Sequence, residues 1–325
     1  MTTTKLTFNE AVDILKRSCS TLILCHRNPD PDTLGSAFAL KHILEHLGSR
    51  VDVACGDNAS SKLNFITGGV SLEYTDKGYE RIIAVDIASP TQLGDLQFLS
   101  ERVDLIIDHH GMNTRFAPYY EDLGAACAEI IFEIYKSLKI EMPKHFFECI
   151  YAGITGDTGG FRYSNVTKRT MEYGAEAIES GIDHAEINRI IFDSKTLGEI
   201  NAEKLTYEKM KLYCDGALAV ILFTNEMKEK NGIKDEDITD IVNCIRSIEG
   251  VLVAVSVKQG TRDIEKYSVS SRANCEIDVS SACVKLGGGG HVRAAGATVV
   301  APSPEEALKM CLPHFEEIVN KYRFS

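Results

Sequence analysis

Residues 21–47 read TLILCHRNPDPDTLGSAFALKHILEHL and contain three successive patterns. The first five residues form an apolar run typical of a buried strand, and the polar loop from His26 to Thr33 follows it. From about Leu34 to Leu47 the apolar residues recur with the spacing of a helix. This order of strand, loop and helix is the repeating unit of a parallel α/β sheet.

The same alternation continues along the first two thirds of the chain. Further strands are predicted at residues 50–55, 81–85 and 103–107, and helices at residues 7–18, 125–138, 144–152, 168–180 and 184–192. Strands that alternate with helices predict an α/β fold with a doubly wound, mainly parallel sheet.

A change of pattern predicts two domains. Residues 196–213 are polar and helix-prone with a sparse apolar stripe, which is typical of a helical linker. Beyond them, strands are predicted at 218–223, 251–258 and 267–273, and helices near 238–248 and 304–322. We therefore expect one α/β domain over residues 1–195, a linker over 196–213 and a second, smaller α/β domain over 214–325.

Composition narrows the class of protein. The 325 residues are 44% hydrophobic and 25% charged, as in ordinary globular proteins. Ten cysteines without a C-x-x-C pair indicate reduced thiols and predict a cytoplasmic location, and no apolar stretch approaches the ~18 residues of a membrane span. The net charge of −12 disfavours binding to long duplex nucleic acid, because such binding is driven by positive charge.

Acidic and histidine side chains follow several of the predicted strands. They are His26, Asp30, Asp32, Asp86, Asp108, His109, His110 and Asp157, the last in a glycine-flanked turn. The carboxyl ends of parallel strands meet at one edge of a sheet, so we expect these side chains to converge. Six of these eight side chains, two imidazoles and four carboxylates, would suit two octahedral divalent cations, whose charge the four carboxylates would balance. Without thiolates the set favours Mn²⁺, with Mg²⁺, Co²⁺ or Fe²⁺ as alternatives.

Simpler readings exist for the individual residues. An Asp after a strand often caps a helix, but capping explains neither the His26-x₃-Asp30-x-Asp32 spacing nor the Asp-His-His triplet. His42-Ile-Leu-Glu-His46 matches the H-x-x-E-H pattern of a class of zinc peptidases. We favour a solvated helix side for His42, Glu45 and His46, because the apolar residues of that helix form a core stripe.

These motifs resemble those of the DHH phosphoesterase superfamily over about residues 15–165. The resemblance rests on residues 26–36, Asp86, the Asp108-His109-His110 triplet and the Gly-Asp-Thr-Gly of residues 156–159. It implies one metal ion held by His26, Asp30 and Asp86, and a second held by Asp32, Asp86, His109 and Asp157. It also implies that Asp108 supports the site and that His110 faces the substrate phosphate, so that Asp86, Asp108 and His110 are the catalytic residues.

A second motif lies near the carboxyl end. Four consecutive glycines, residues 287–290, can turn backbone N–H groups toward an anion, and His291 follows them. Arg272 ends a predicted strand and is the side chain suited to bidentate phosphate binding. The span 268–296 resembles the DHH-associated C-terminal domain. This resemblance implies that the nucleotide end distal to the cleaved phosphate is bound by Arg272, Gly289, Gly290 and His291.

The combination of the two domains resembles bacterial nano-RNases that also dephosphorylate 3′-phosphoadenosine 5′-phosphate. It implies a Mn²⁺-dependent hydrolase, with two metal ions, that acts on short single-stranded RNA or DNA and on nucleotide phosphates, as a monomer or homodimer. One alternative is a phosphodiesterase for cyclic di-AMP or its linear product. Another is a catalytically silent nucleotide-binding regulator, which would be expected to have lost some of the six metal ligands.

Overall fold

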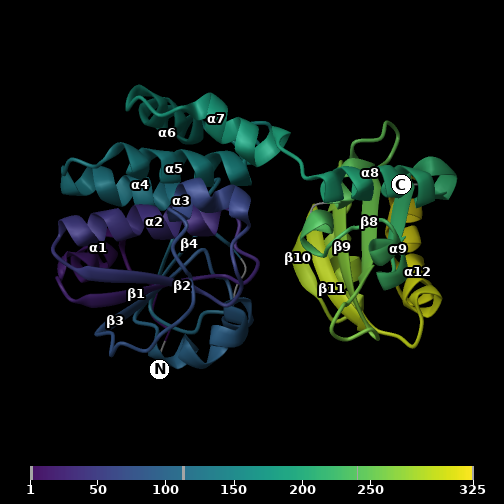
Figure 1. Cartoon of the computed structure of the whole chain (residues 1–325), viewed down its shortest axis with the longest axis horizontal. Coiled ribbons are helices and arrows are strands. Elements are labelled where there is room, and N and C mark those ends of the chain that lie inside the picture. Colours follow the sequence, from purple (N-terminus) through teal and green to yellow (C-terminus); the bar gives the residue numbers. More distant parts are fainter. Residues whose placement is uncertain (1–2, 112–113, 240, 324–325) are drawn as a thin grey trace. The chain divides into compact units, whose positions relative to one another are not determined.

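The computed structural model describes residues 3–111, 114–239 and 241–323. It divides into two compact units, Met1–Ser194 and Lys195–Ser325 (Figure 1). Within the described ranges, no helix has both the length and the apolarity that crossing a membrane requires.

The first unit is built on a five-stranded sheet in the order β2-β1-β3-β4-β5, and each adjacent pair is parallel. Its strands are β1 (Ser20–Cys25), β2 (Arg50–Cys55), β3 (Arg81–Val85), β4 (Leu105–Asp108) and β5 (Tyr119–Glu121). The predicted parallel α/β fold is confirmed. Because the chain passes from β2 across β1 to β3, the loops after β1 and β3 lie where the strand order reverses, which is the usual place for a ligand crevice.

Helices cover this sheet. They are α1 (Phe8–Lys16), α2 (Pro31–His46), α3 (Asn64–Thr67), α4 (Cys127–Leu138), α5 (Lys144–Asp157), α6 (Lys168–Glu179) and α7 (His184–Asn188). Figure 1 shows α2 over the sheet, with α4 and α5 in the next layer. One apolar core joins the sheet to these helices, and a second, smaller core packs the 3₁₀ segment Pro90–Arg102 against the sheet.

Helix α2 begins three residues earlier than predicted. Asp30 caps it by accepting hydrogen bonds from the backbone N–H groups of Asp32 and Thr33, at 2.9 and 3.0 Å. Pro31 occupies the first turn, where its missing N–H costs nothing. The sequence predicts a loop that continues to Thr33, whereas the structure places Asp32 inside the helix, where it is fully buried.

The turn predicted around Asp157 is wrong, because α5 continues through Gly153 and Gly156 to Asp157. A Cβ atom at Gly153 would lie 2.8 Å from Asp32 Oδ1, and one at Gly156 would lie 2.8 Å from Pro31 Cβ. The two glycines therefore allow α5 to approach the start of α2. This close packing brings Asp157 to the carboxyl edge of the sheet.

A histidine pair joins the same two helices farther from that edge. His42 Nε2 of α2 lies 2.8 Å from His145 Nδ1 of α5, and His145 Nε2 lies 3.0 Å from the carbonyl oxygen of Phe65. Glu45 and His46 are exposed as expected, but His42 is half-buried in this contact. None of the clusters of potential metal ligands among the described residues includes His42 or His46, so the zinc-peptidase alternative has no site here.

This pair leads to a prediction about pH. Burial lowers the pKa of His42, the nearby His145 and Lys41 lower it too, and Glu45 opposes them. A histidine in the unfolded chain binds a proton near pH 6.5, so the unfolded state gains protons first as pH falls. The free energy of unfolding should therefore fall as pH decreases below about 6.5. In denaturant titrations from pH 8 to pH 5, His42→Gln should lose less stability than the wild type.

The control for this experiment is His46→Gln, which changes an exposed histidine one turn along the same helix. It should keep the pH dependence of the wild type. Equal pH dependence in both variants would contradict a role for the buried pair.

The second unit contains a mixed sheet in the order β10-β11-β9-β8-β7-β6, with β7 and β8 parallel and the other pairs antiparallel. The strands are β6 (Lys211–Tyr213), β7 (Leu218–Phe223), β8 (Val253–Gln259), β9 (Lys266–Ala273), β10 (Gly289–His291) and β11 (Ala294–Val300). This confirms a second α/β fold. The second half of the glycine-rich segment forms an edge strand, because Gly289, Gly290 and His291 pair with β11.

Helices pack on both faces of the second sheet. They are α8 (Leu197–Lys209), α9 (Asn225–Lys230), α10 (Val242–Arg246), α11 (Val279–Lys285) and α12 (Pro304–Arg323). The second unit has two apolar cores. Helices α11 and α12 contribute to one of them, and helices α8 and α10 contribute to the other. Helix α8 spans most of the predicted linker, 196–213, and buries Ala202 and Leu205 in the second unit.

Candidate metal centre

Three ligand clusters meet at the carboxyl edge of the first sheet. In the first, the ligand atoms of His26, Asp30 and Asp86 lie within 4.8 Å of one another. His26 Nε2 is 3.6 Å from Asp30 Oδ2 and 3.4 Å from Asp86 Oδ2. Its Nδ1 lies 2.8 Å from the carbonyl oxygen of Arg27. A carbonyl only accepts hydrogen bonds, so the neutral ring carries its proton on Nδ1 and directs the Nε2 lone pair toward the carboxylates.

The second cluster contains Asp32, His109 and Asp157, again within 4.8 Å. His109 Nε2 lies 3.8 Å from Asp32 Oδ2, 3.3 Å from Asp157 Oδ2 and 3.3 Å from Asp86 Oδ1. Its Nδ1 lies 3.2 Å from the carbonyl oxygen of Gly124, which selects the same tautomer as in His26. Both imidazoles therefore present an unprotonated nitrogen to a group of carboxylates.

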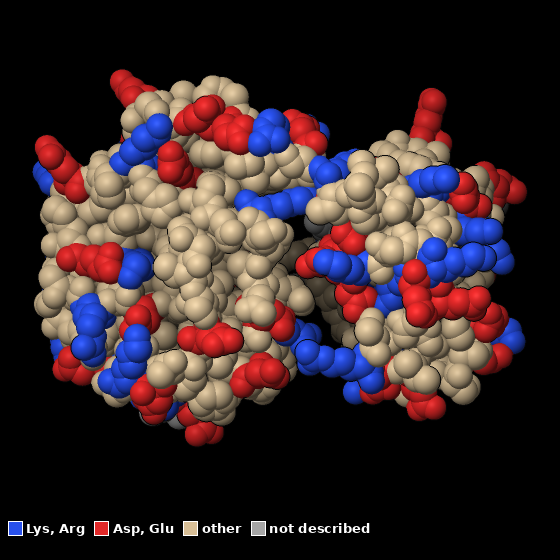
Figure 2. Space-filling view, viewed as in Figure 1, with Lys and Arg blue, Asp and Glu red and all other residues tan. Residues whose placement is uncertain are grey.

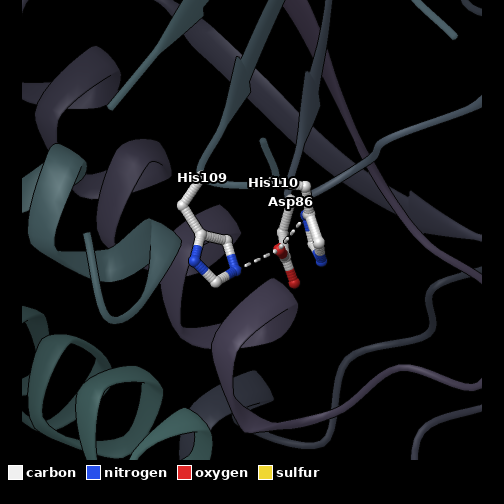
Figure 3. A group of neighbouring side chains, drawn as sticks. All are labelled: Asp86, His109 and His110. Atoms are coloured by element: carbon white, nitrogen blue, oxygen red, sulfur yellow. Dashed lines mark ion pairs between the residues drawn. The ribbon is translucent and has the colours of Figure 1, made fainter. Parts of the chain in front are cut away.

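Asp86 connects the clusters. Its Oδ2 is the oxygen near His26, its Oδ1 is the oxygen near His109, and Figure 3 shows it between His109 and His110. It follows β3 with a positive φ of 58°, a conformation that Asp tolerates better than most residues. Its backbone N–H donates to the carbonyl of Ile107 at 2.9 Å, which joins the ends of β3 and β4.

One oxygen of Asp86 indicates what the clusters bind. Asp86 is 3% exposed, and its Oδ1 has no hydrogen-bond partner among the described residues. A buried carboxylate oxygen without a donor is costly, and a neutral His109 offers it a lone pair rather than a proton. A divalent cation between these atoms would satisfy both, so the residues present fit a metal ion.

The carboxylates also influence one another. Burial and the charge of Asp86 raise the pKa of Asp32 to about 7, and burial with Asp32 as neighbour raises the pKa of Asp157 well above its usual value. Burial lowers the pKa of His109, but contact with Asp86 and the other acids outweighs it and, without a cation, holds that pKa well above its usual range. The ring is neutral when a cation takes the place of the Nε2 proton. Crowded acids that retain protons are typical of a site whose positive charge is supplied by a bound cation.

Asp32 is oriented mainly by backbone groups. Its two carboxylate oxygens accept hydrogen bonds from the N–H groups of Cys127 and Ala128 at the start of α4, at 2.6 and 2.9 Å. Ser36 Oγ lies 3.2 Å from Oδ1. No sequence motif predicts these donors, because every residue except proline carries a backbone N–H group.

The third cluster contains Asp86, His109 and His110, and His110 is also paired with Asp108. Asp108 is fully buried, its Oδ1 lies 2.7 Å from His110 Nδ1, and its Oδ2 accepts from Arg115 at 3.2 Å. Asp108 is therefore placed to orient the ring of His110. Arg115 belongs to no sequence motif, and only the structure shows its largely buried side chain beside Asp108 and Glu121.

The predicted substrate-binding residues lie together in the second unit. Arg272 of β9 pairs with Ala294 of β11, and Ala294 pairs with His291 of β10. Paired residues on neighbouring strands share a face, so Arg272 and His291 face the same way with only a methyl group between them. Gly289 pairs with Gly296 and lies on that face too, and a Cβ at Gly289 would meet no described atom within 4 Å. Packing does not require glycine there.

Gly290 differs from Gly289. Its φ is 141°, and a Cβ would lie 2.6 Å from the carbonyl oxygen of Ala294. Glycine at this position is therefore required by the pairing of β10 with β11. The backbone conformation and packing thus explain why residue 290 is glycine, whereas they do not explain why residue 289 is glycine.

Known proteins share both halves of this architecture. The family model for the DHH family, N-terminal domain, matches residues 20–154, and the DHHA1 domain model matches residues 216–321. The bifunctional oligoribonuclease and PAP phosphatase NrnA of Thermus thermophilus is 28% identical over 303 residues, covering 91% of this chain and 89% of the relative. The protein of that name from Bacillus subtilis is 26% identical over 287 residues, covering 85% and 89%.

Solved structures show the same fold. An exopolyphosphatase-related protein from Bacteroides fragilis matches with a TM-score of 0.85 and 22% identity, over 97% of this chain and 96% of that one. RecJ from Thermus thermophilus, solved in complex with Mn²⁺, matches with a TM-score of 0.51 and 15% identity, over 97% of this chain and 54% of that one. These matches show the fold, and the two family models show that the chain contains a DHH-family N-terminal domain in the first unit and a DHHA1 domain in the second.

Proposed function

We propose that the protein is a phosphoester hydrolase with two Mn²⁺ ions that degrades short single-stranded oligonucleotides from an end and dephosphorylates 3′-phosphoadenosine 5′-phosphate. The observation that carries this proposal is that all six predicted ligands lie together, with Asp86 between His26 of one cluster and His109 of another. Relatives with both domains are named oligoribonuclease and PAP phosphatase, which supports the substrate class. A silent regulator would not need all six ligands.

His26, Asp30 and Asp86 would hold one ion, and Asp32, Asp86, His109 and Asp157 the other. Bound divalent cations supply an activated water and neutralise charge on the phosphate. The chain's own contribution is to hold both imidazoles in one tautomer through the carbonyls of Arg27 and Gly124. His110, oriented by Asp108, would donate a hydrogen bond to the phosphate and stabilise charge that develops on it.

Short substrates agree with the charge of the protein. Lys and Arg are interspersed with Asp and Glu over the face seen in Figure 2, and the net charge is −12. Long duplexes are bound mainly by extended positive surfaces. We also propose a cytoplasmic location, because the ten cysteines are free thiols.

The proposal is tested with Mn²⁺-loaded protein and a panel of labelled substrates. The panel contains dinucleotides, five-mers, long oligomers, cyclic di-AMP and 3′-phosphoadenosine 5′-phosphate, each in RNA and DNA form where both exist. We expect kcat/KM to be highest for dinucleotides to five-mers, with measurable release of phosphate from 3′-phosphoadenosine 5′-phosphate. Cleavage of cyclic di-AMP far ahead of the linear substrates would replace the proposed substrate class with the cyclic one.

Arg272→Ala tests the substrate-binding row of the second unit. A hydrogen bond to a charged group contributes about 1.5–3 kcal/mol, so kcat/KM for a dinucleotide should fall on the order of ten- to a hundred-fold, chiefly through KM. Metal content should not change. Bis-p-nitrophenyl phosphate has no distal nucleotide, so its slow hydrolysis should be nearly unaffected.

The matched control is Arg262→Ala, which removes an exposed arginine from the same unit. It should leave both activities unchanged. If Arg272→Ala reduced hydrolysis of the generic ester as much as that of the dinucleotide, Arg272 would act on the fold or the metal centre rather than on the distal nucleotide.

A further inference from the structure

Residues 122–128, which lead from β5 into the start of α4, contact two of the proposed metal ligands through their backbone. The carbonyl oxygen of Gly124 lies 3.2 Å from His109 Nδ1, and the N–H groups of Cys127 and Ala128 donate to Asp32. Residues 122–128 thus orient two ligands of the second cluster. Whatever holds this segment in place also determines where His109 Nε2 points.

Arg169 of α6 binds carboxylates on both sides of the Gly124 peptide, those of Asp122 and Glu129. Its guanidinium contacts both oxygens of Asp122, with Nη1 at 2.6 Å and Nη2 at 3.2 Å, in the bidentate geometry that Arg forms with carboxylates. The same group binds Glu129 Oε2 of α4, with Nε at 3.1 Å and Nη2 at 3.0 Å. One arginine therefore joins the start of the segment to the first turn of α4.

Glu129 depends on this contact. It is 1% exposed, and its Oε1 has no hydrogen-bond partner among the described residues. Its Oε2 accepts from the backbone N–H of Ala125 at 3.3 Å as well as from Arg169. A buried carboxylate needs a charged partner, and Arg169 supplies it.

The side chains of Arg169 and Glu129 lie directly against the backbone of Gly124. A Cβ at Gly124 would lie 2.4 Å from Arg169 Nη2 and 2.6 Å from Glu129 Oε2. Asn165 adds a second link, because its Nδ2 donates to the carbonyl oxygens of both Ala125 and Asp157 at 3.1 Å. The Gly124–Ala125 peptide is thus enclosed by side chains from α4, α6 and the segment after α5.

We propose that Arg169, acting through Asp122 and Glu129, is a positioning residue that fixes the Gly124 carbonyl against His109 and so sets the affinity of the cluster of Asp32, His109 and Asp157 for its divalent cation. This inference rests on the proposed dinuclear centre. Groups that orient metal-ligating histidines typically change metal affinity about 10–100-fold when removed. The cluster of His26, Asp30 and Asp86 has its own orienting carbonyl, that of Arg27, and is independent of Arg169.

The experiment is a Mn²⁺ titration of the metal-free, full-length protein by calorimetry, with electron paramagnetic resonance to count bound ions. Arg169→Met alone leaves the Glu129 charge buried, so Arg169→Met/Glu129→Gln is measured beside it. We expect one of the two Mn²⁺ ions to bind about 10–100-fold more weakly in both variants, and the other to bind as in the wild type. Arg169→Lys keeps the charge without the bidentate geometry and should show a smaller loss.

The control is Lys136→Met, which removes another ion pair between α4 and α6, that of Lys136 with Glu176 at 2.6 Å. It should leave both Mn²⁺ affinities unchanged. Reduced thermal stability of the Arg169 variants with unchanged affinity for both ions would overturn the inference and leave the proposed function standing. A wild-type protein that binds only one Mn²⁺ would overturn the dinuclear centre and this inference together.

Discussion

Asp86→Asn should abolish hydrolysis of every substrate, including bis-p-nitrophenyl phosphate, and weaken the binding of both metal ions. Asp86 has one oxygen near His26 and the other near His109, so its loss would change both proposed ligand sets at once. Asn keeps the size of the side chain and tolerates the positive φ of 58°, which separates the effect of charge from strain in the backbone. We expect activity to fall by more than about 100-fold, because removal of even one electrostatic group can cost that much.

The measurement combines steady-state hydrolysis with metal content after dialysis against Mn²⁺. Asp95→Asn is the matched control, since Asp95 is an exposed aspartate on the 3₁₀ segment that follows β3. It should keep both activity and metals. Near-normal turnover by Asp86→Asn would refute the assignment of Asp86 as the shared ligand, while the loss of only one ion would place it in a single cluster.

His110→Ala should reduce kcat by about 100- to 1000-fold while both metal ions stay bound. His110 is held by Asp108 at 2.7 Å, and a group that stabilises charge on the reacting phosphate typically contributes a factor of this size. Its ring nitrogen Nδ1 also lies 3.6 Å from Asp86 Oδ1, and His110 forms a potential ligand cluster with Asp86 and His109. The two histidines of the triplet therefore have to be distinguished by experiment.

Elemental analysis makes that distinction. His109→Ala should lose one ion, because His109 Nε2 faces Asp32, Asp86 and Asp157, whereas His110→Ala should retain both. Asp108→Asn should resemble His110→Ala in kcat, since it removes the carboxylate that orients the ring. If His110→Ala lost an ion and His109→Ala did not, the roles of the two residues would be exchanged.

Local patterns predicted most elements of the first unit. A parallel strand is covered by helices on both faces, so its sequence is apolar almost without interruption. This is why the mainly apolar runs at residues 21–25 and 81–85 correctly predicted strands of the parallel sheet. Errors occurred where a local signal was overridden by packing. Gly153 and Gly156 signal a turn, yet they lie within α5 because only glycine allows that helix to approach Asp32 and Pro31.

Short elements escaped prediction for a related reason. β5 has only three half-buried residues, and β10 contains two glycines, so neither has the apolar pattern of a strand. Each forms because the neighbouring strand, β4 or β11, has backbone N–H and C=O groups along its edge with which the short segment can pair. The pairing of β10 with β11 then brings His291 into the row that contains Arg272.

The sequence by itself determined the parallel α/β fold of the first unit, the presence of a second α/β unit, and the residue types at the edge of the first sheet. These features depend on local periodicity and on where each residue falls after its strand. Only the tertiary structure decided that Asp86 lies between His26 and His109, and that Asp157 ends a helix beside Asp32. It alone also revealed Arg115, Arg169 and the Gly124 carbonyl. Such contacts join residues far apart in the chain, or use backbone groups that every residue carries, so no local pattern records them.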